Sequence, residues 1–104
     1  MARLPRIRGT QFGLRNPANV EAIKADMRAN RFRFSDSEGQ IGGVLDPQGT
    51  YHIEDGQHRM VAALELYAES GDDRYVLMLL RWGRWEDLPA PKRSRPMPSR
   101  GWWG

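Results

Sequence analysis

The stretch YHIEDGQHRMVAALE, residues 51–65, places several chemically active side chains within a few positions, directly before an apolar helical pattern. Asp55 can bind a metal or cap a helix, and His58 can exchange protons near neutral pH. Arg59 carries a planar guanidinium that can bind two phosphate oxygens at once. Gly56 allows a ligand to approach the backbone closely. Together these residue types indicate acid–base chemistry on an anion such as phosphate.

A helix that begins at Gln57 would hold this cluster at its positive end. The first backbone N–H groups of a helix have no acceptor within it, and the helix dipole adds positive charge there. Such ends bind phosphate readily. In this interpretation Arg59 holds the phosphate, His58 transfers a proton, and Gln57 contributes together with the amide of Gly56.

The acidic residues of the cluster leave a metal site open. Asp55 would orient His58 or coordinate a metal, and Glu54 is the other acidic candidate ligand. The two histidines of the chain do not form a helical H-x-x-x-H pair, so the metal signal is weak. If the site uses a cofactor, we expect Mg²⁺. The chain has no cysteine, which excludes disulfides, thiolate ligands and a cysteine nucleophile.

The same cluster also has a purely structural interpretation. Asp55 would then serve only as the cap of the helix, and Arg59 would pair with Glu54 or Glu65. His52 is expected to be an ordinary residue on a strand face.

Local patterns predict the elements that position the cluster. Residues 16–30 should form a first helix, because Asn and Pro favour its start and apolar residues recur at helical spacing. Residues 31–34 alternate Arg and Phe, as in a short strand or extended segment. Residues 41–53 fit a β-hairpin whose turn reads Asp-Pro-Gln-Gly, with Gly42 and Gly43 forming a bulge or a tight bend.

The second half of the chain continues with a helix, a strand and a tail. Residues 57–70 repeat apolar side chains at helical spacing and stop before Gly71. Residues 75–80, YVLMLL, are expected to form a buried strand. We therefore predict an α+β fold with a small mixed sheet over residues 1–88. Residues 89–104 form a basic, Pro/Arg-rich tail.

Charge is concentrated at the two ends of the 104-residue chain, whose formal net charge is +3. Residues 1–15 contain four arginines and no acidic residue, and residues 81–104 contain six basic residues against two acidic ones. If the ends meet, they form one basic face suited to an anionic partner. No apolar run approaches the ~20 residues that span a membrane. The basic residues expected to contact nucleic-acid phosphates are Arg15, Arg31, Arg33, Arg93, Arg95 and Arg100.

The stretch YHIEDGQHRMVAALEL resembles the central sequence of the ParB/sulfiredoxin superfamily, where a strand leads into a G-x-x-R motif at a helix start. Here the motif is GQHR, residues 56–59, followed by two alanines. Upstream, LRNPANVEAIKADMRANRF resembles the arginine-bearing segment and first helix of that family. The resemblance covers about residues 12–80.

The resemblance implies a ParB/sulfiredoxin-like fold with a phosphate site at the start of the second helix. Members include CTP-hydrolysing partitioning proteins, sulfiredoxins, free-serine kinases, nucleases and toxin domains of bacterial polymorphic toxins. Sulfiredoxins carry a cysteine in this motif, so the present chain cannot perform their chemistry. The partitioning proteins have a downstream helix-turn-helix that this tail cannot supply. The tail itself, RSRPMPSRGWWG, resembles the closing segment of toxin-type members.

These expectations favour the toxin domain of a polymorphic toxin that a bacterium secretes or delivers by contact. It would act as a nuclease on DNA or RNA in the cytoplasm of the target cell, and a cognate immunity protein would neutralise it. Two alternatives stay open: an NTPase or phosphotransferase that uses the same phosphate site, and a non-catalytic module that binds nucleic acid. Trp102 and Trp103 would pack on the domain, stack on bases or contact the immunity protein.

Overall fold

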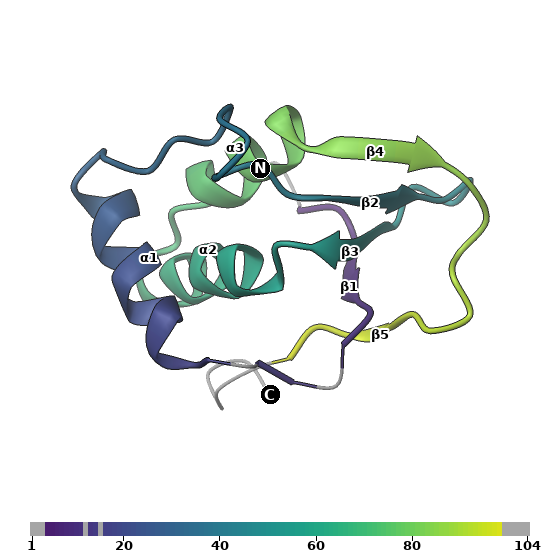
Figure 1. Cartoon of the computed structure of the whole chain (residues 1–104), viewed down its shortest axis with the longest axis horizontal. Coiled ribbons are helices and arrows are strands. Elements are labelled where there is room, and N and C mark those ends of the chain that lie inside the picture. The colour runs from purple at the N-terminus through teal and green to yellow at the C-terminus, as the bar shows by residue number, and fades with distance from the viewer. Residues whose placement is uncertain (1–3, 12, 15, 99–104) are drawn as a thin grey trace.

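A computed structural model of the chain describes residues 4–11, 13–14 and 16–98. Within them, a mixed sheet has the strand order β4-β2-β3-β1-β5, and three helices gather at one side of the molecule (Figure 1). The architecture is therefore α+β with a small mixed sheet, as predicted. In chain order the elements are β1 (Ile7–Gly9), α1 (Ala18–Arg28), β2 (Gly42–Leu45), β3 (Tyr51–Asp55), α2 (Gln57–Ser70), α3 (Arg74–Trp82), β4 (Arg84–Asp87) and β5 (Arg95–Pro96).

The predicted hairpin is confirmed. Strands β2 and β3 pair antiparallel, and the Gly49 N–H donates to the Asp46 carbonyl at 3.0 Å across the turn. The strand register shifts between Gly42 and Gly43, which confirms the predicted irregularity. A Cβ at Gly43 would lie 1.9 Å from the backbone oxygen of His52, so a larger residue cannot fit there.

The two predicted helices are also confirmed, with different accuracy at their ends. Helix α2 begins and ends where the sequence predicts, and Gly71 follows it with φ +76°. Helix α1 is shorter than predicted, and Pro17 takes its N-cap position without a side-chain hydrogen bond. Phe32 and Phe34 lie in an irregular segment and contact each other edge to face, with ring centroids 4.8 Å apart.

The prediction of a buried strand at residues 75–80 is wrong, because these residues lie in helix α3. An unbroken apolar run has no period, so it does not distinguish a strand from a helix. In the helix, Leu77 and Met78 face outward and are 40% and 37% exposed. The buried residues of this helix are Val76, Leu79 and Leu80.

Strand β3 is buried on both faces, because side chains alternate along a strand. Ile53 joins the apolar core with the helices, whereas His52 points to the opposite face and contacts Ser94 of the C-terminal segment. Ser94, in the described part of the predicted tail, therefore packs on the sheet. Residues 99–104, which include Arg100 and the two final tryptophans, lie outside the described residues.

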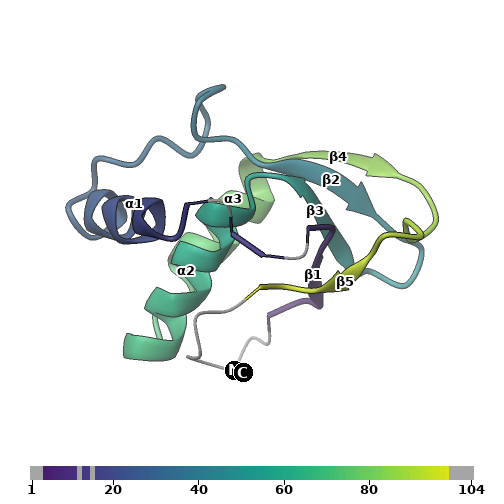
Figure 2. The same cartoon turned by 60° about the horizontal axis from the view of Figure 1, so that its bottom comes forward.

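The two basic ends of the chain meet in the sheet. Strand β5 pairs antiparallel with β1, which places Arg95 opposite Gly9 and Pro96 opposite Arg8. Figure 2 shows the yellow C-terminal segment running beside β1. Within the described ranges, no helix is both long enough and apolar enough to cross a membrane.

Asp46 fixes the β2–β3 turn. One carboxylate oxygen accepts the backbone N–H groups of Gln48 and Thr50 at 2.9 and 3.0 Å, and the other lies 2.7 Å from Nε2 of His52. The hydrogen bond from His52, followed by that from Thr50, lowers the pKa of Asp46 below its ordinary value.

The lowered pKa of Asp46 predicts an acid-dependent stability. The unfolded chain binds this proton more tightly than the folded chain, so the stabilisation is present above the ordinary aspartate pKa of about 4 and is lost as the pH falls through the folded pKa. We expect the urea midpoint of Asp46→Asn to fall less between pH 6 and pH 3 than that of the unchanged protein. Equal falls in both proteins would contradict this assignment.

Candidate functional site

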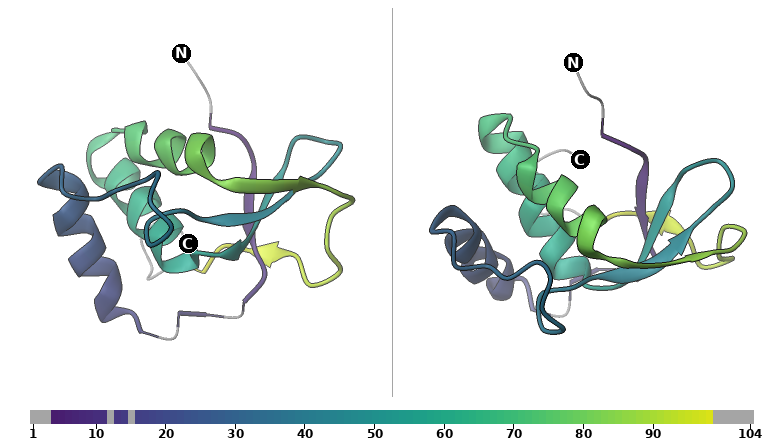
Figure 3. Two further views of the ribbon diagram at one scale, coloured as in Figure 1. Left: turned by 45° about the horizontal axis from the view of Figure 1, so that its top comes forward. Right: turned by 90° about the horizontal axis from the view of Figure 1, so that it is seen from above.

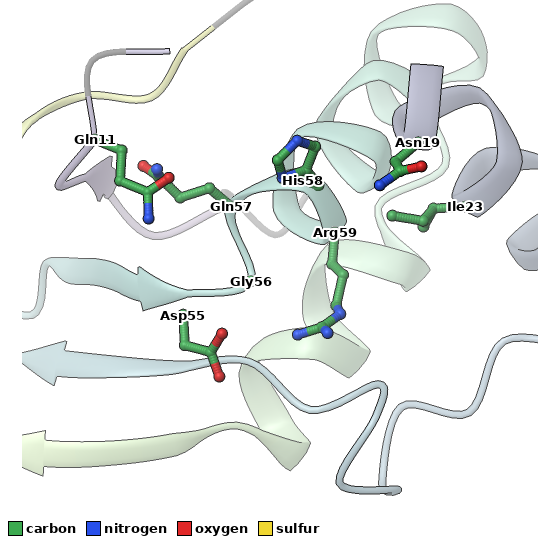
Figure 4. A pocket seen from close by; sticks show the side chains of 8 residues that line it. All are labelled: Gln11, Asn19, Ile23, Asp55, Gly56, Gln57, His58 and Arg59. Atoms are coloured by element: carbon green, nitrogen blue, oxygen red, sulfur yellow. The ribbon is translucent and has the colours of Figure 1, made fainter. Parts of the chain in front are cut away.

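The first turn of α2 opens into a pocket with a volume of about 330 Å³. Figure 4 shows side chains from α2, from α1, from the end of β3 and from the segment after β1 around it. The sequence predicts five of the lining residues, namely Asp55, Gly56, Gln57, His58 and Arg59. It does not single out the other three, Gln11, Asn19 and Ile23.

Gly56 is the N-cap of α2, and its backbone has the left-handed conformation with φ +99° and ψ 30°. The N-cap has no side-chain hydrogen bond, so Asp55 does not cap the helix. The first hydrogen bond of the helix runs from Met60 N–H to the Gly56 carbonyl at 3.1 Å. The backbone N–H groups of the three residues between them therefore lack acceptors within the helix. These donors make this end of the pocket positive, and no acidic residue in the first turn of α2 offsets that charge.

We expect Gly56→Ala to lower the free energy of unfolding by about 2–4 kcal/mol, through backbone strain plus a collision. Its Cβ would lie 2.4 Å from Cγ2 of Ile41. Gly49→Ala is the matched control, because Gly49 also has a positive φ, of +85°, but no atom within 4 Å of the added Cβ. The control variant Gly49→Ala should lower the free energy of unfolding by only about 1 kcal/mol. Equal losses in urea unfolding of the two variants would show that the contact with Ile41 does not constrain this turn.

Gln57 contributes a buried side-chain amide of which one atom lacks a partner among the described residues. Its side chain is 2% exposed, and Oε1 accepts the Thr10 N–H at 3.1 Å. Nε2 is buried and has no hydrogen-bond partner within the part of the chain that the structure describes. An unsatisfied buried donor costs about 1–3 kcal/mol. An acceptor oxygen brought by a ligand would remove that cost.

His58 is oriented by the backbone of the segment before α1. Its Nε2 accepts the N–H of Asn16 at 3.1 Å. Because an accepting ring nitrogen carries no hydrogen, the neutral ring holds its proton on Nδ1. His58 is therefore arranged to donate a hydrogen bond through Nδ1. The predicted partner Asp55 makes an ion pair with Arg84 instead.

Arg59 brings to the pocket a positive charge that makes no ion pair with any carboxylate of the described residues. Its two candidate partners pair with other cations, Glu54 with Arg93 and Glu65 with Lys24. No carboxylate among the described residues lies within ion-pair distance of Arg59, so the predicted structural pairing is not formed. A partly buried guanidinium without an acidic partner favours an anionic ligand.

The pocket offers a metal few ligands from the protein. Asp55 is the carboxylate that lines it, and this side chain lies 3.4 Å from Arg84. Glu54 is bound to Arg93. Within the described ranges, no group of three or more His, Cys, Asp or Glu side chains could hold a metal ion. Mg²⁺ commonly takes one carboxylate and completes its shell with phosphate and water oxygens, so Asp55 fits the ion only together with a substrate.

The remaining predicted basic residues that the structure describes do not line this pocket. Arg31 and Arg33 pair with Asp26 and Asp36 and line a separate surface pocket. Arg95 lies on β5. Arg15 and Arg100 lie outside the described residues. The site therefore consists of the first turn of α2 and its neighbours, and the basic surface is distributed elsewhere.

Comparison of the chain with models of known protein families, with curated proteins and with solved structures finds no match. The resemblance to the ParB/sulfiredoxin superfamily thus stays a prediction that rests on residues 12–80.

Proposed function

We propose that the chain binds a phosphodiester of nucleic acid at the first turn of α2 and cleaves it. The observation that carries this proposal is the guanidinium of Arg59, which has no acidic partner among the described residues. It lines the same pocket as the first-turn backbone N–H groups, which lack acceptors within the helix. Phosphate fits this combination because its oxygens accept several charge-assisted hydrogen bonds at once. The buried Nε2 of Gln57 supplies one further donor in the lining.

Each lining residue has a chemical role in this proposal. Arg59 and the first-turn amides hold the phosphate oxygens and stabilise the charge that develops on them. His58 donates a hydrogen bond from Nδ1 to the leaving oxygen, which takes its proton from solvent, and Nε2 of His58 stays fixed by the N–H of Asn16. Asp55 accepts a proton from the attacking water. A bound Mg²⁺ would add charge neutralisation beside Asp55.

We further propose the biological setting that the resemblance implies. The chain would be the toxin domain of a secreted or contact-delivered bacterial toxin, active in the cytoplasm of the target cell and neutralised by an immunity protein. Support comes from the sequence resemblance and from the basic ends that meet in the sheet. Nucleic-acid binding should weaken steeply as salt rises, because basic side chains displace counterions from phosphates.

Incubation of the purified chain with plasmid DNA, total RNA and tRNA tests this function. Each substrate is used with Mg²⁺ and with EDTA, beside the variants His58→Ala and Arg59→Ala. We expect one nucleic acid to be cleaved and both variants to lose that cleavage. Binding without cleavage of any substrate would support a non-catalytic module, and cleavage that survives in both variants would place the reaction elsewhere.

The second candidate is an enzyme that hydrolyses a free nucleotide or transfers its phosphoryl group. The pocket volume favours it, because about 330 Å³ lies within the range of small-molecule sites. A thermal-shift panel of ATP, CTP and GTP with Mg²⁺ distinguishes the candidates. A large shift with one base would favour the nucleotide enzyme, and the absence of any shift would count against it.

A further inference from the structure

A second polar cluster lies on the sheet face opposite the core. Oδ2 of Asp46 is 2.7 Å from Nε2 of His52, and Nδ1 of His52 is 2.8 Å from Oγ of Ser94. The side chains of His52 and Asp46 are 2% and 6% exposed. The three residues thus form a continuous Asp–His–Ser chain of hydrogen bonds.

The hydrogen bonds fix where the protons lie. Asp46 has a lowered pKa and is ionised near neutral pH, so its carboxylate can only accept. Nε2 of a neutral His52 must therefore carry the ring proton and donate it to Asp46. Nδ1 is then an acceptor, and the hydroxyl of Ser94 donates to it. This is the proton arrangement in which a histidine can act as the base for a serine nucleophile.

Arg8 completes the cluster. Its Nε donates to Oγ of Ser94 at 2.8 Å, and no carboxylate among the described residues pairs with it. A guanidinium at this distance stabilises negative charge that develops on the serine oxygen. Its other N–H groups make no hydrogen bond with the described residues, so they can bind the oxygens of an anionic substrate. Ser94 itself is partly exposed, so a small reagent can approach it.

The cluster is separate from the pocket at α2. It joins the β2–β3 turn to the segment before β5, and Figure 3 shows both at the end of the sheet away from the helices. None of Arg8, Asp46, His52 or Ser94 lines the α2 pocket. The Asp–His–Ser chain is therefore structurally independent of the α2 pocket.

We infer that Ser94 is an activated nucleophile for phosphoryl compounds, with His52 as its base, Asp46 as the positioning residue of His52, and Arg8 as the anion-binding group. Oγ of Ser94 would form a bond to phosphorus as the bond to the leaving group breaks. The hydroxyl proton passes to Nδ1 of His52, where the Asp46 carboxylate balances the charge. It then passes through solvent to the leaving group, and the product is a phosphorylated Ser94.

Labelling of the whole chain with diisopropyl fluorophosphate tests nucleophilicity directly. Mass spectrometry of peptides gives the rate at each serine in one sample. Ser35 and Ser37 are exposed and serve as internal controls. We expect Ser94 to react at least about 100-fold faster than either, the scale of general-base assistance. Reaction of Ser94 at the rate of the controls would overturn the inference and leave the cluster as a link that holds the C-terminal segment on the sheet.

Two variants separate the roles of the neighbours. His52→Gln should bring Ser94 to the rate of the control serines. Arg8→Gln should reduce phosphorylation of Ser94 by acetyl phosphate, which is anionic, more strongly than labelling by the neutral fluorophosphate. Equal effects of Arg8→Gln on the two reagents would contradict an anion-binding role. The comparison among serines of the unchanged protein stays decisive if either variant fails to fold.

Discussion

Arg59→Ala should reduce nucleic-acid cleavage by about 100- to 1000-fold, the usual effect of removing one preorganised charged donor from a reacting centre. The substitution removes the guanidinium that has no acidic partner among the described residues, and the pocket keeps its backbone donors. It also removes the hydrogen bond from Nη1 to the Gln40 carbonyl, which is 2.9 Å long. The measurement is the initial rate of cleavage of the best substrate under one salt condition.

Arg81→Ala provides the matched control for Arg59→Ala. Arg81 is an exposed residue of α3 outside the pocket, so its removal changes the net charge equally. Arg59→Lys keeps the charge and loses the planar fork, and it should retain intermediate activity. If Arg81→Ala lowered cleavage as much as Arg59→Ala, general electrostatic attraction would explain the activity. Circular dichroism of each variant excludes a loss of fold as the cause.

Lys24→Met is expected to have the largest effect on stability. Lys24 lies in α1 with its side chain 2% exposed, and Nζ is 3.1 Å from Glu65 and 2.6 Å from Glu69 of α2. Burial opposes the charge, but the hydrogen bonds and charges of Glu69 and Glu65 outweigh it, so the pKa of Lys24 is raised. Removing one partner of a buried ion pair typically costs about 3–5 kcal/mol. The free energy of unfolding of a small domain is only about 5–15 kcal/mol in total, so this variant should be close to unfolding.

The double variant Lys24→Met/Glu65→Leu tests the cause of that loss. Glu65 is fully buried, and replacement of a buried ion pair by apolar side chains is often neutral. We expect the double variant to recover much of the urea midpoint lost in Lys24→Met. A double variant less stable than either single variant would show that the packing of these side chains matters more than their charges.

The sequence predicts the elements whose signals are local. Helix α2 combines an apolar repeat with Gly71 at its end, and the hairpin combines a turn sequence with flanking apolar residues. These signals act over a few residues, so one chain suffices to detect them. The run at residues 75–80 carries no such period, and the surrounding packing decides its conformation.

The candidate site is predictable to the same extent. The residues from Asp55 to Arg59 are consecutive and lie at a helix start, so the sequence shows them together. Asn16 is 42 positions from His58, and no local pattern links the two. Ser94 and His52 are also 42 positions apart. From the sequence, His52 is predicted only as a residue on a strand face. Contacts of this kind depend on the order of the strands, which sequence patterns do not specify.

The central claim is that a phosphodiester docks on the first turn of α2, and amide chemical shifts test it most directly. ¹⁵N-labelled protein would be titrated with a short phosphorothioate oligonucleotide, which resists cleavage. We predict the largest shifts at the amides of Gln57, His58 and Arg59 and at Nε of Arg59. Shifts confined to other basic surfaces, such as that around Arg31 and Arg33, with an unchanged first turn of α2, would contradict the claim.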